Sequence, residues 1–81
     1  MDDWLAAASV RIARSAGDEA SFYELDDEQV AQLLELARVA AHESGARTNA
    51  PLLCYLVGLA RGRRPGKDLA QLADDIVGKR T

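Results

Sequence analysis

One nearly continuous apolar stretch, residues 50–60, constrains the fold more than any other feature of this 81-residue chain. Pro51 stands at its start, where proline is favoured in the first turn of a helix. Because apolar side chains fall on all sides of such a helix, we expect residues 51–61 to be the buried, central element. A buried strand is the competing interpretation of so short a run. The proline start favours a helix, which we expect Gly62 to end.

The strongest helix signals surround residues 27–44. Asp26 and Gln29 have the spacing of a capping box, in which each side chain accepts a hydrogen bond from the other residue's backbone N–H. Gly45 follows the last apolar position and is suited to the left-handed conformation that often ends a helix. These signals predict a helix over residues 27–44.

Two further segments carry apolar residues at helical spacing, one at each end of the chain. No repeat or linker divides the sequence, so we expect a single domain, residues 1–81. The predicted fold class is all-α, a compact bundle of four short helices at about 3–14, 27–44, 51–61 and 68–77, with the third helix central.

The charge of the chain is unevenly distributed. The net charge is −3, but residues 1–35 carry −7 and residues 36–81 carry +4. General nucleic-acid binding needs an overall basic footprint, so a nucleic-acid partner is disfavoured. This polarity permits docking to a charged protein partner; the alternative is that the two halves of the chain attract each other.

The remaining composition favours a cytoplasmic protein of bacterial origin. The longest apolar run is about half of the ~20 residues that cross a bilayer, and the acidic N-terminus is unlike the basic start of a signal peptide. A single unpaired cysteine fits a reducing compartment. Arginine outnumbers lysine eight to two, which suggests a GC-rich bacterial coding sequence.

No catalytic or metal-binding motif is apparent. Cys54 lies inside the apolar stretch, where a thiol behaves as a small hydrophobic group with a raised pKa. His42 is the only histidine, and the acidic groups at 26–28 and 74–75 lack the spaced ligands and glycine of a calcium loop. We therefore expect no enzyme activity, no metal and no cofactor. Without a disulfide, so small a domain would gain stability from a protein partner or from self-association.

A candidate binding cluster spans the junction between the second and third predicted helices. Arg38 and His42 are four residues apart and project from one helix face. Arg47 and Asn49 follow, ahead of the backbone N–H groups at the next helix start. Such a cluster suits a phosphate or carboxylate. The alternative is that Arg38 and His42 cap helix carbonyls while Arg47 pairs with Glu43 or solvent.

A second candidate surface is the basic run that follows the apolar stretch. Arg61, Arg63 and Arg64 suit an acidic partner or a nucleotide phosphate, although the run lacks the glycine spacing and Lys-Ser/Thr ending of a P-loop. A solvated loop is the alternative. Trp4 is a further candidate interface residue, because large aromatic side chains often anchor interfaces. For Trp4 and Tyr55 the alternative is internal packing.

Several short motifs together resemble a known family. They are Asp-Trp-Leu at 3–5, Leu-Ala-Arg-x-x-Ala-His at 36–42, Arg47, Ala-Pro-Leu at 50–52 and Leu-x-Gly-Leu-Ala-x-Gly at 56–62. This pattern resembles a small all-helical domain of unknown function from high-GC bacteria. The resemblance implies a domain found alone or appended to a molybdenum cofactor guanylyltransferase, the enzyme that attaches GMP to molybdopterin. This chain lacks the glycine-rich nucleotide-binding region of that enzyme.

The resemblance and the polarised charge favour a non-enzymatic accessory or adaptor protein. Its expected partner is the molybdenum cofactor guanylyltransferase or a molybdoenzyme such as formate dehydrogenase. The alternative function is a small anion- or nucleotide-binding module that uses Arg38, His42 and Arg47. A DNA-binding domain is disfavoured, because the link between the second and third helices is longer than a helix-turn-helix turn.

Overall fold

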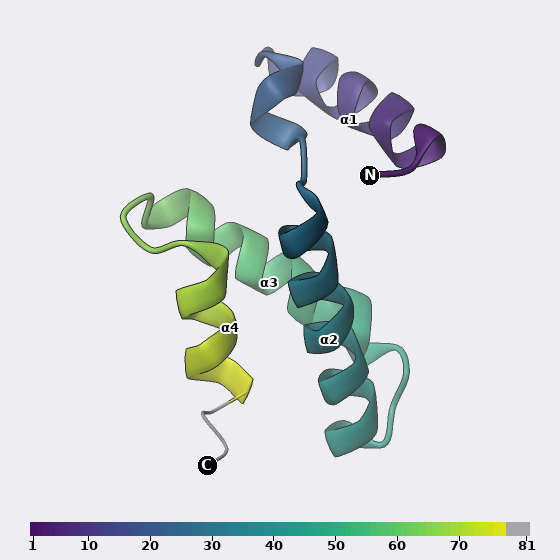
Figure 1. Cartoon of the computed structure of the whole chain (residues 1–81), viewed down its shortest axis with the longest axis vertical. Helices are drawn as coiled ribbons and strands as arrows, with labels where there is room; N and C mark the ends of the chain where they lie inside the picture. Colours follow the sequence, from purple (N-terminus) through teal and green to yellow (C-terminus); the bar gives the residue numbers. More distant parts are fainter. Residues whose placement is uncertain (78–81) are drawn as a thin grey trace. The chain divides into compact units, whose positions relative to one another are not determined.

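The computed structural model describes residues 1–77, which form four α-helices and one short 3-10 helix, with no strand in this part of the chain (Figure 1). The elements are α1 (Asp3–Ala16), η1 (Ala20–Tyr23), α2 (Asp27–Ser44), α3 (Asn49–Arg63) and α4 (Leu69–Val77). The predicted all-α fold is confirmed. The chain divides into two units, one over Met1–Val30 and one that begins at Ala31.

The α2 boundaries agree with the prediction, and their signals are visible in the structure. The Asp26 N–H donates to Gln29 Oε1 over 3.0 Å, and the Gln29 N–H donates to Asp26 Oδ1 over 2.7 Å. Gly45 has a φ of 71°, which only glycine adopts without strain. An unpredicted second capping box, between Asp68 and Gln71, precedes α4 with both distances at 2.9 Å.

The expected end of α3 at Gly62 is wrong. The helix continues to Arg63, and the N–H of Arg64 closes it by donating to the Ala60 carbonyl over 2.9 Å. Glycine lowers helix propensity by only about 1 kcal/mol, so a single glycine in a tertiary context does not terminate a helix. Gly58 is also accommodated inside α3.

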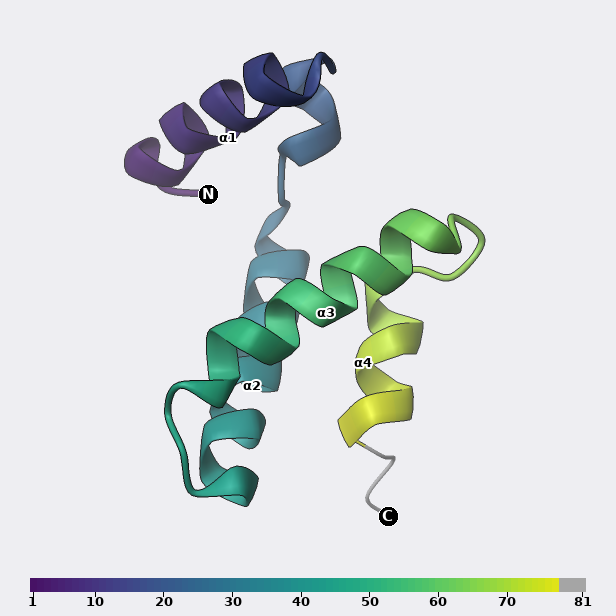
Figure 2. The same ribbon diagram turned by 180° about the vertical axis from the view of Figure 1, so that it is seen from behind.

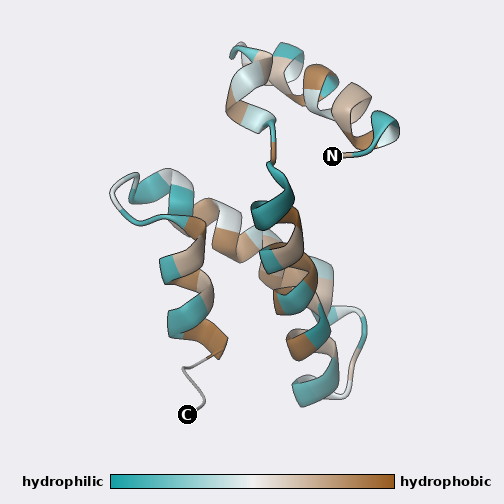
Figure 3. Ribbon diagram, in the orientation of Figure 1, coloured by the Kyte–Doolittle hydropathy of each residue, from teal (hydrophilic) through white to brown (hydrophobic). Residues whose placement is uncertain are grey.

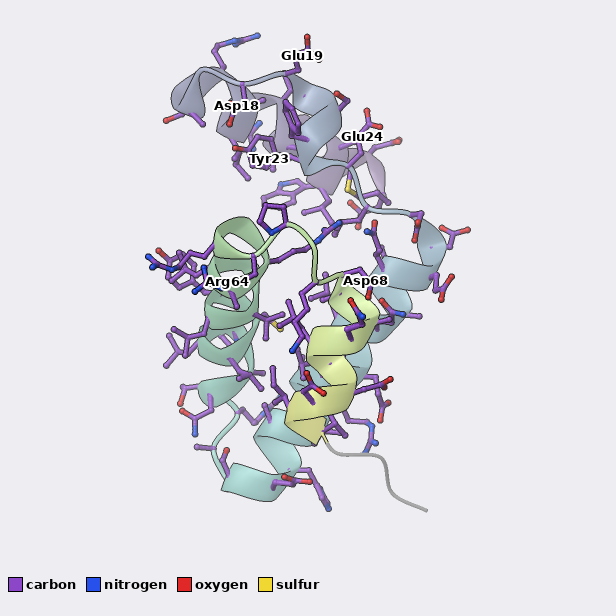
Figure 4. All side chains as sticks on the ribbon, turned by 90° about the vertical axis from the view of Figure 1, so that its left-hand side faces the viewer. Asp18, Glu19, Tyr23, Glu24, Arg64 and Asp68 are labelled. Atoms are coloured by element: carbon purple, nitrogen blue, oxygen red, sulfur yellow. The ribbon has the colours of Figure 1, made fainter. Side chains whose placement is uncertain are left out.

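The first unit is held together by local contacts. The Leu5 N–H donates to the Asp2 carboxylate over 2.7 Å, which caps α1. After α1, the Tyr23 hydroxyl donates to Asp18 Oδ2 over 2.6 Å, so the two side chains lie together (Figure 4). A cavity of about 350 Å³ lies in this unit beside Ser9. The Ser9 hydroxyl donates to the Leu5 carbonyl over 2.9 Å, so its hydrogen-bond donor is already used within α1.

The second unit has a small core shared by three helices. Leu36 of α2, Val57 of α3, and Leu69 and Leu72 of α4 form a buried cluster. Partly buried side chains pack around it, namely Leu33, Leu53, Cys54, Ala60 and Val77. In two opposite views, α3 crosses both α2 and α4 (Figures 1 and 2). Helix α3 is therefore central to this unit, as predicted.

The expectation that α3 is buried on all sides is wrong. Only Val57 is fully buried in this helix, whereas four large apolar side chains are exposed. They are Leu52 (60% exposed), Tyr55 (67%), Leu56 (58%) and Leu59 (46%). Hydrophobic residues lie along all three helices of the unit (Figure 3), but so small a core covers only one face of α3. The other face keeps its apolar side chains in contact with solvent.

Candidate functional site

The exposed apolar side chains of α3 form a single stripe along the helix. Leu52, Tyr55, Leu56 and Leu59 have the spacing i, i+3, i+4 and i+7, which places them on one face of an α-helix. Hereafter these four residues are the outer stripe. The core-facing residues, Leu53, Val57 and Ala60, have a similar helical spacing about a third of a turn away. Helix α3 is thus apolar on two faces, of which the core uses one.

The outer stripe runs into a cluster of arginines at the C-terminal end of α3. Arg63 lies four residues after Leu59, so it continues the same face, whereas Arg61 lies on the other side of α3 and Arg64 follows directly after the helix. All three arginines are exposed. Figure 4 shows Arg64 at this end of α3, beside the loop that leads to Asp68. The Arg64 Nη1 donates to the Arg63 carbonyl over 3.1 Å.

All charged side chains of α3 are positive. The helix contains no acidic residue. The ion pairs found within residues 1–77 join Arg38 to Glu35 and Lys67 to Asp75, so neither neutralises the arginine cluster. The surface therefore combines an apolar stripe with a positively charged end, an arrangement that suits an apolar partner bearing carboxylates.

Two glycines, Gly58 and Gly62, form a row next to the outer stripe. Apart from its own stretch of helix, a Cβ atom added at either position would meet no atom of the described residues within 4 Å, so the core does not require glycine at these positions. Neither glycine has a positive φ. Each lowers helix propensity by about 1 kcal/mol, and packing among residues 1–77 does not explain their presence in α3. They do leave the helix backbone open to close approach.

The junction residues predicted as a site are all at the surface, in the second unit. Arg38 is paired with Glu35, one turn earlier on α2, with Arg38 Nε donating to Glu35 Oε2 over 3.1 Å. The hydrogen bond from Arg38 lowers the pKa of Glu35, and the hydrogen bond to Glu35 raises the pKa of Arg38. His42 is exposed in the last turn of α2, on the Arg38 face, and Arg47 is exposed in the following turn.

The start of α3 offers few backbone donors to an anion. The Asn49 N–H donates to the Ala46 carbonyl over 3.1 Å, and the Ala50 N–H donates to the Arg47 carbonyl over 3.2 Å. The next residue is Pro51, which has no N–H. An anion at this junction would therefore depend mainly on the side chains of Arg47, His42 and the already paired Arg38.

Cys54 has the structural character predicted for it. It is half-buried against the core, and its thiol lies 3.9 Å from the Leu33 carbonyl, to which it donates. Burial raises the pKa of the Cys54 thiol. Within the described residues, no group of three or more His, Cys, Asp or Glu side chains is placed to hold a metal ion. No helix of residues 1–77 has the length and apolar content that a membrane span requires.

The arginine end of the α3 surface was predicted from the sequence, whereas the exposure of the outer stripe was not. The basic run was predicted as a candidate surface or a solvated loop; its arginines are exposed, but Arg61 and Arg63 belong to α3. Trp4 is 72% exposed in the first unit. The alternative that Trp4 and Tyr55 are packed internally is wrong, because both rings are largely in solvent. The spacing of the outer stripe was visible in the sequence, but helical periodicity alone does not say which of two apolar faces the core will cover.

A family model covers nearly the whole chain. A family model described as "Domain of unknown function (DUF6457)" matches residues 1–80. No curated protein and no solved structure matches the chain. The comparisons therefore carry no activity or ligand over to this protein, and its function has to be inferred from the surfaces described above.

Proposed function

The chain belongs to the DUF6457 family of domains of unknown function, and we propose that it is a non-enzymatic helical adaptor that binds another protein through the outer stripe of α3. The observation that supports this function is the exposure of four large apolar side chains on one helix face. Contiguous exposed apolar side chains of this kind mark interaction sites on proteins. Burying a leucine-sized side chain contributes roughly 1.5–3 kcal/mol, so partial burial of all four would stabilise a complex.

The proposal includes a cellular role in molybdenum cofactor maturation, in the cytoplasm of a bacterium. The partner would be the molybdenum cofactor guanylyltransferase or a molybdoenzyme such as formate dehydrogenase. Support for this part comes from the motif resemblance described above. Three residues of those motifs, Leu52, Leu56 and Leu59, are exposed on the outer stripe, where a role in binding explains them better than internal packing.

Affinity capture from the bacterial host tests this function. The wild-type chain should recover the guanylyltransferase or a molybdoenzyme, and the double variant Leu56→Gln/Leu59→Gln should lose it. Glutamine is a good helix former, so α3 should persist in the variant. Leu34→Gln is a matched control, because Leu34 is an exposed leucine (67%) on α2. Recovery of neither protein class would contradict the molybdenum cofactor role.

A second proposal is a small anion- or nucleotide-binding module at the α2–α3 junction. It is supported by Arg38 and His42 on one exposed face of α2 and by Arg47 in the turn that follows. NMR titration with GMP and GTP tests it. Chemical-shift changes confined to residues 38–53 would support the module, and the absence of changes there would eliminate it.

A further inference from the structure

We propose that the outer stripe of α3 receives an acidic amphipathic helix from another protein. This inference rests on the proposed adaptor function and specifies the chemistry of the partner. The rows of side chains in the outer stripe and the glycines beside them indicate that the partner segment is a helix. The positive charge of α3 indicates that this helix is acidic.

The rows of side chains on the outer stripe of α3 match the surface of a second helix packed against it. Residues four apart form rows along a helix surface, and packed helices place the rows of one into the grooves of the other. Leu52 and Leu56 form one such row, and Tyr55, Leu59 and Arg63 form the next. The surface from Leu52 to Arg63 is about 17 Å long at 1.5 Å per residue, or about three turns. A partner helix with apolar residues at i, i+3, i+4 and i+7 matches that length and spacing.

The glycine row gives the partner backbone a place to approach. Gly58 and Gly62 are four residues apart and form the row beside Tyr55, Leu59 and Arg63. Because a Cβ atom at either glycine would meet nothing among residues 1–77 outside its own stretch of helix, the open space above them is available to another molecule. Small residues at helix interfaces allow close backbone contact. A helix lying against the Tyr55 row would cover these glycines.

Charge selects an acidic partner over a second α3. The only ionised side chains of α3 are Arg61 and Arg63, with Arg64 directly after the helix, and α3 has no acid. Two copies packed through their outer stripes would bring no carboxylate from α3 to these arginines. A partner helix with Asp or Glu at the end that lies over Arg63 would pair with this arginine and would be steered to the surface by the positive charge of all three.

Two synthetic peptides test the inference with the full chain. Both carry leucines at i, i+3, i+4 and i+7, and the polar positions are Glu in one and Lys in the other. Titrated into ¹⁵N-labelled protein, the Glu peptide should shift amides of residues 52–63 and bind at least tenfold more tightly than the Lys peptide. The difference should shrink as salt is raised, because salt screens exposed charges. Equal affinity of the two peptides, or shifts confined to other residues, would overturn the inference.

Substitutions separate a binding role from a structural one. Leu56→Gln/Leu59→Gln should weaken Glu-peptide binding at least tenfold, whereas Leu34→Gln should leave it unchanged. Gly62→Leu places bulk in the glycine row and should weaken binding at least tenfold without lowering Tm, since open space surrounds that position. Unchanged peptide affinity in both stripe and glycine variants would contradict the inference.

The outcomes also distinguish this inference from the adaptor function. If the Leu56→Gln/Leu59→Gln variant still captures a molybdenum cofactor protein, the adaptor function would stand. The outer stripe would then be rejected as the binding surface. Glu-peptide binding at residues 52–63 without capture of such a protein would support the surface and reject the molybdenum cofactor role. Sedimentation showing a wild-type dimer that Leu56→Gln dissociates, with no peptide binding, would identify the occupant as a second copy and overturn the inference.

Discussion

Alanine substitutions on the two faces of α3 should have very different effects on stability. Val57 is 2% exposed, so Val57→Ala removes two buried methyl-sized groups, worth about 0.8 kcal/mol each, and leaves a cavity. We expect a loss of about 2–3 kcal/mol. Leu56 is 58% exposed, so Leu56→Ala loses only the covered part of three such groups. That loss is about 1 kcal/mol, partly offset by the higher helix propensity of alanine.

The assay is urea unfolding at 25 °C, followed by circular dichroism at 222 nm. A core in so small a domain supplies roughly 3–5 kcal/mol, so Val57→Ala should remove half or more of the stability. The urea concentration at the midpoint of unfolding should fall strongly for Val57→Ala and only slightly for Leu56→Ala. The dependence of the unfolding free energy on urea concentration should be the same in both variants. Losses of equal size would refute the reasoning, because they would mean that the chain itself buries the outer stripe.

Three further predictions concern single residues. Gly58→Ala should raise the free energy of unfolding by about 0.5–1 kcal/mol, because the added methyl group has open space among the described residues and alanine favours a helix. The measurement is Tm, which should rise. A lower Tm would show that the fold needs this glycine. The Glu35 carboxyl should titrate below its ordinary pKa by NMR and return to it in Arg38→Gln. The stability from that pair should be present at neutral pH and be lost as the pH falls through the lowered pKa of Glu35. Cys54 should be alkylated more slowly at pH 8 in the folded chain than in urea, because a raised thiol pKa leaves less thiolate; equal rates would contradict its burial.

The ends of a helix could be predicted from the sequence where both a capping box and a terminating glycine were present. Residues 27–44 carry both a capping box and a left-handed glycine, and the predicted and observed bounds of α2 coincide. The end of α3 was misplaced because Gly62 was interpreted as a stop, although helix hydrogen bonding continues past it to Arg64. The 3-10 helix Ala20–Tyr23 was not predicted, since its short sequence has no periodicity to read.

The candidate surface on α3 was harder to predict than the helices. The sequence shows that residues 50–60 are apolar on nearly all sides, but burial depends on how many other helices are present to cover them. Here the core contacts one face, through Val57, and leaves Leu56 and its neighbours in solvent. The arginines at the end of α3 were recognised as a basic run directly after the apolar stretch, because the solvent exposure of charged side chains depends little on packing.

The most direct test of an open outer stripe is the paramagnetic relaxation of leucine and valine methyl groups by a soluble gadolinium chelate. Methyl groups of Leu56 and Leu59 should relax as strongly as those of the exposed Leu34, whereas those of Val57 and Leu36 should be protected. Addition of the Glu peptide should protect Leu56 and Leu59 while leaving Leu34 unchanged. Protection of Leu56 and Leu59 equal to that of Val57 in the free protein would contradict a binding surface on this face of α3.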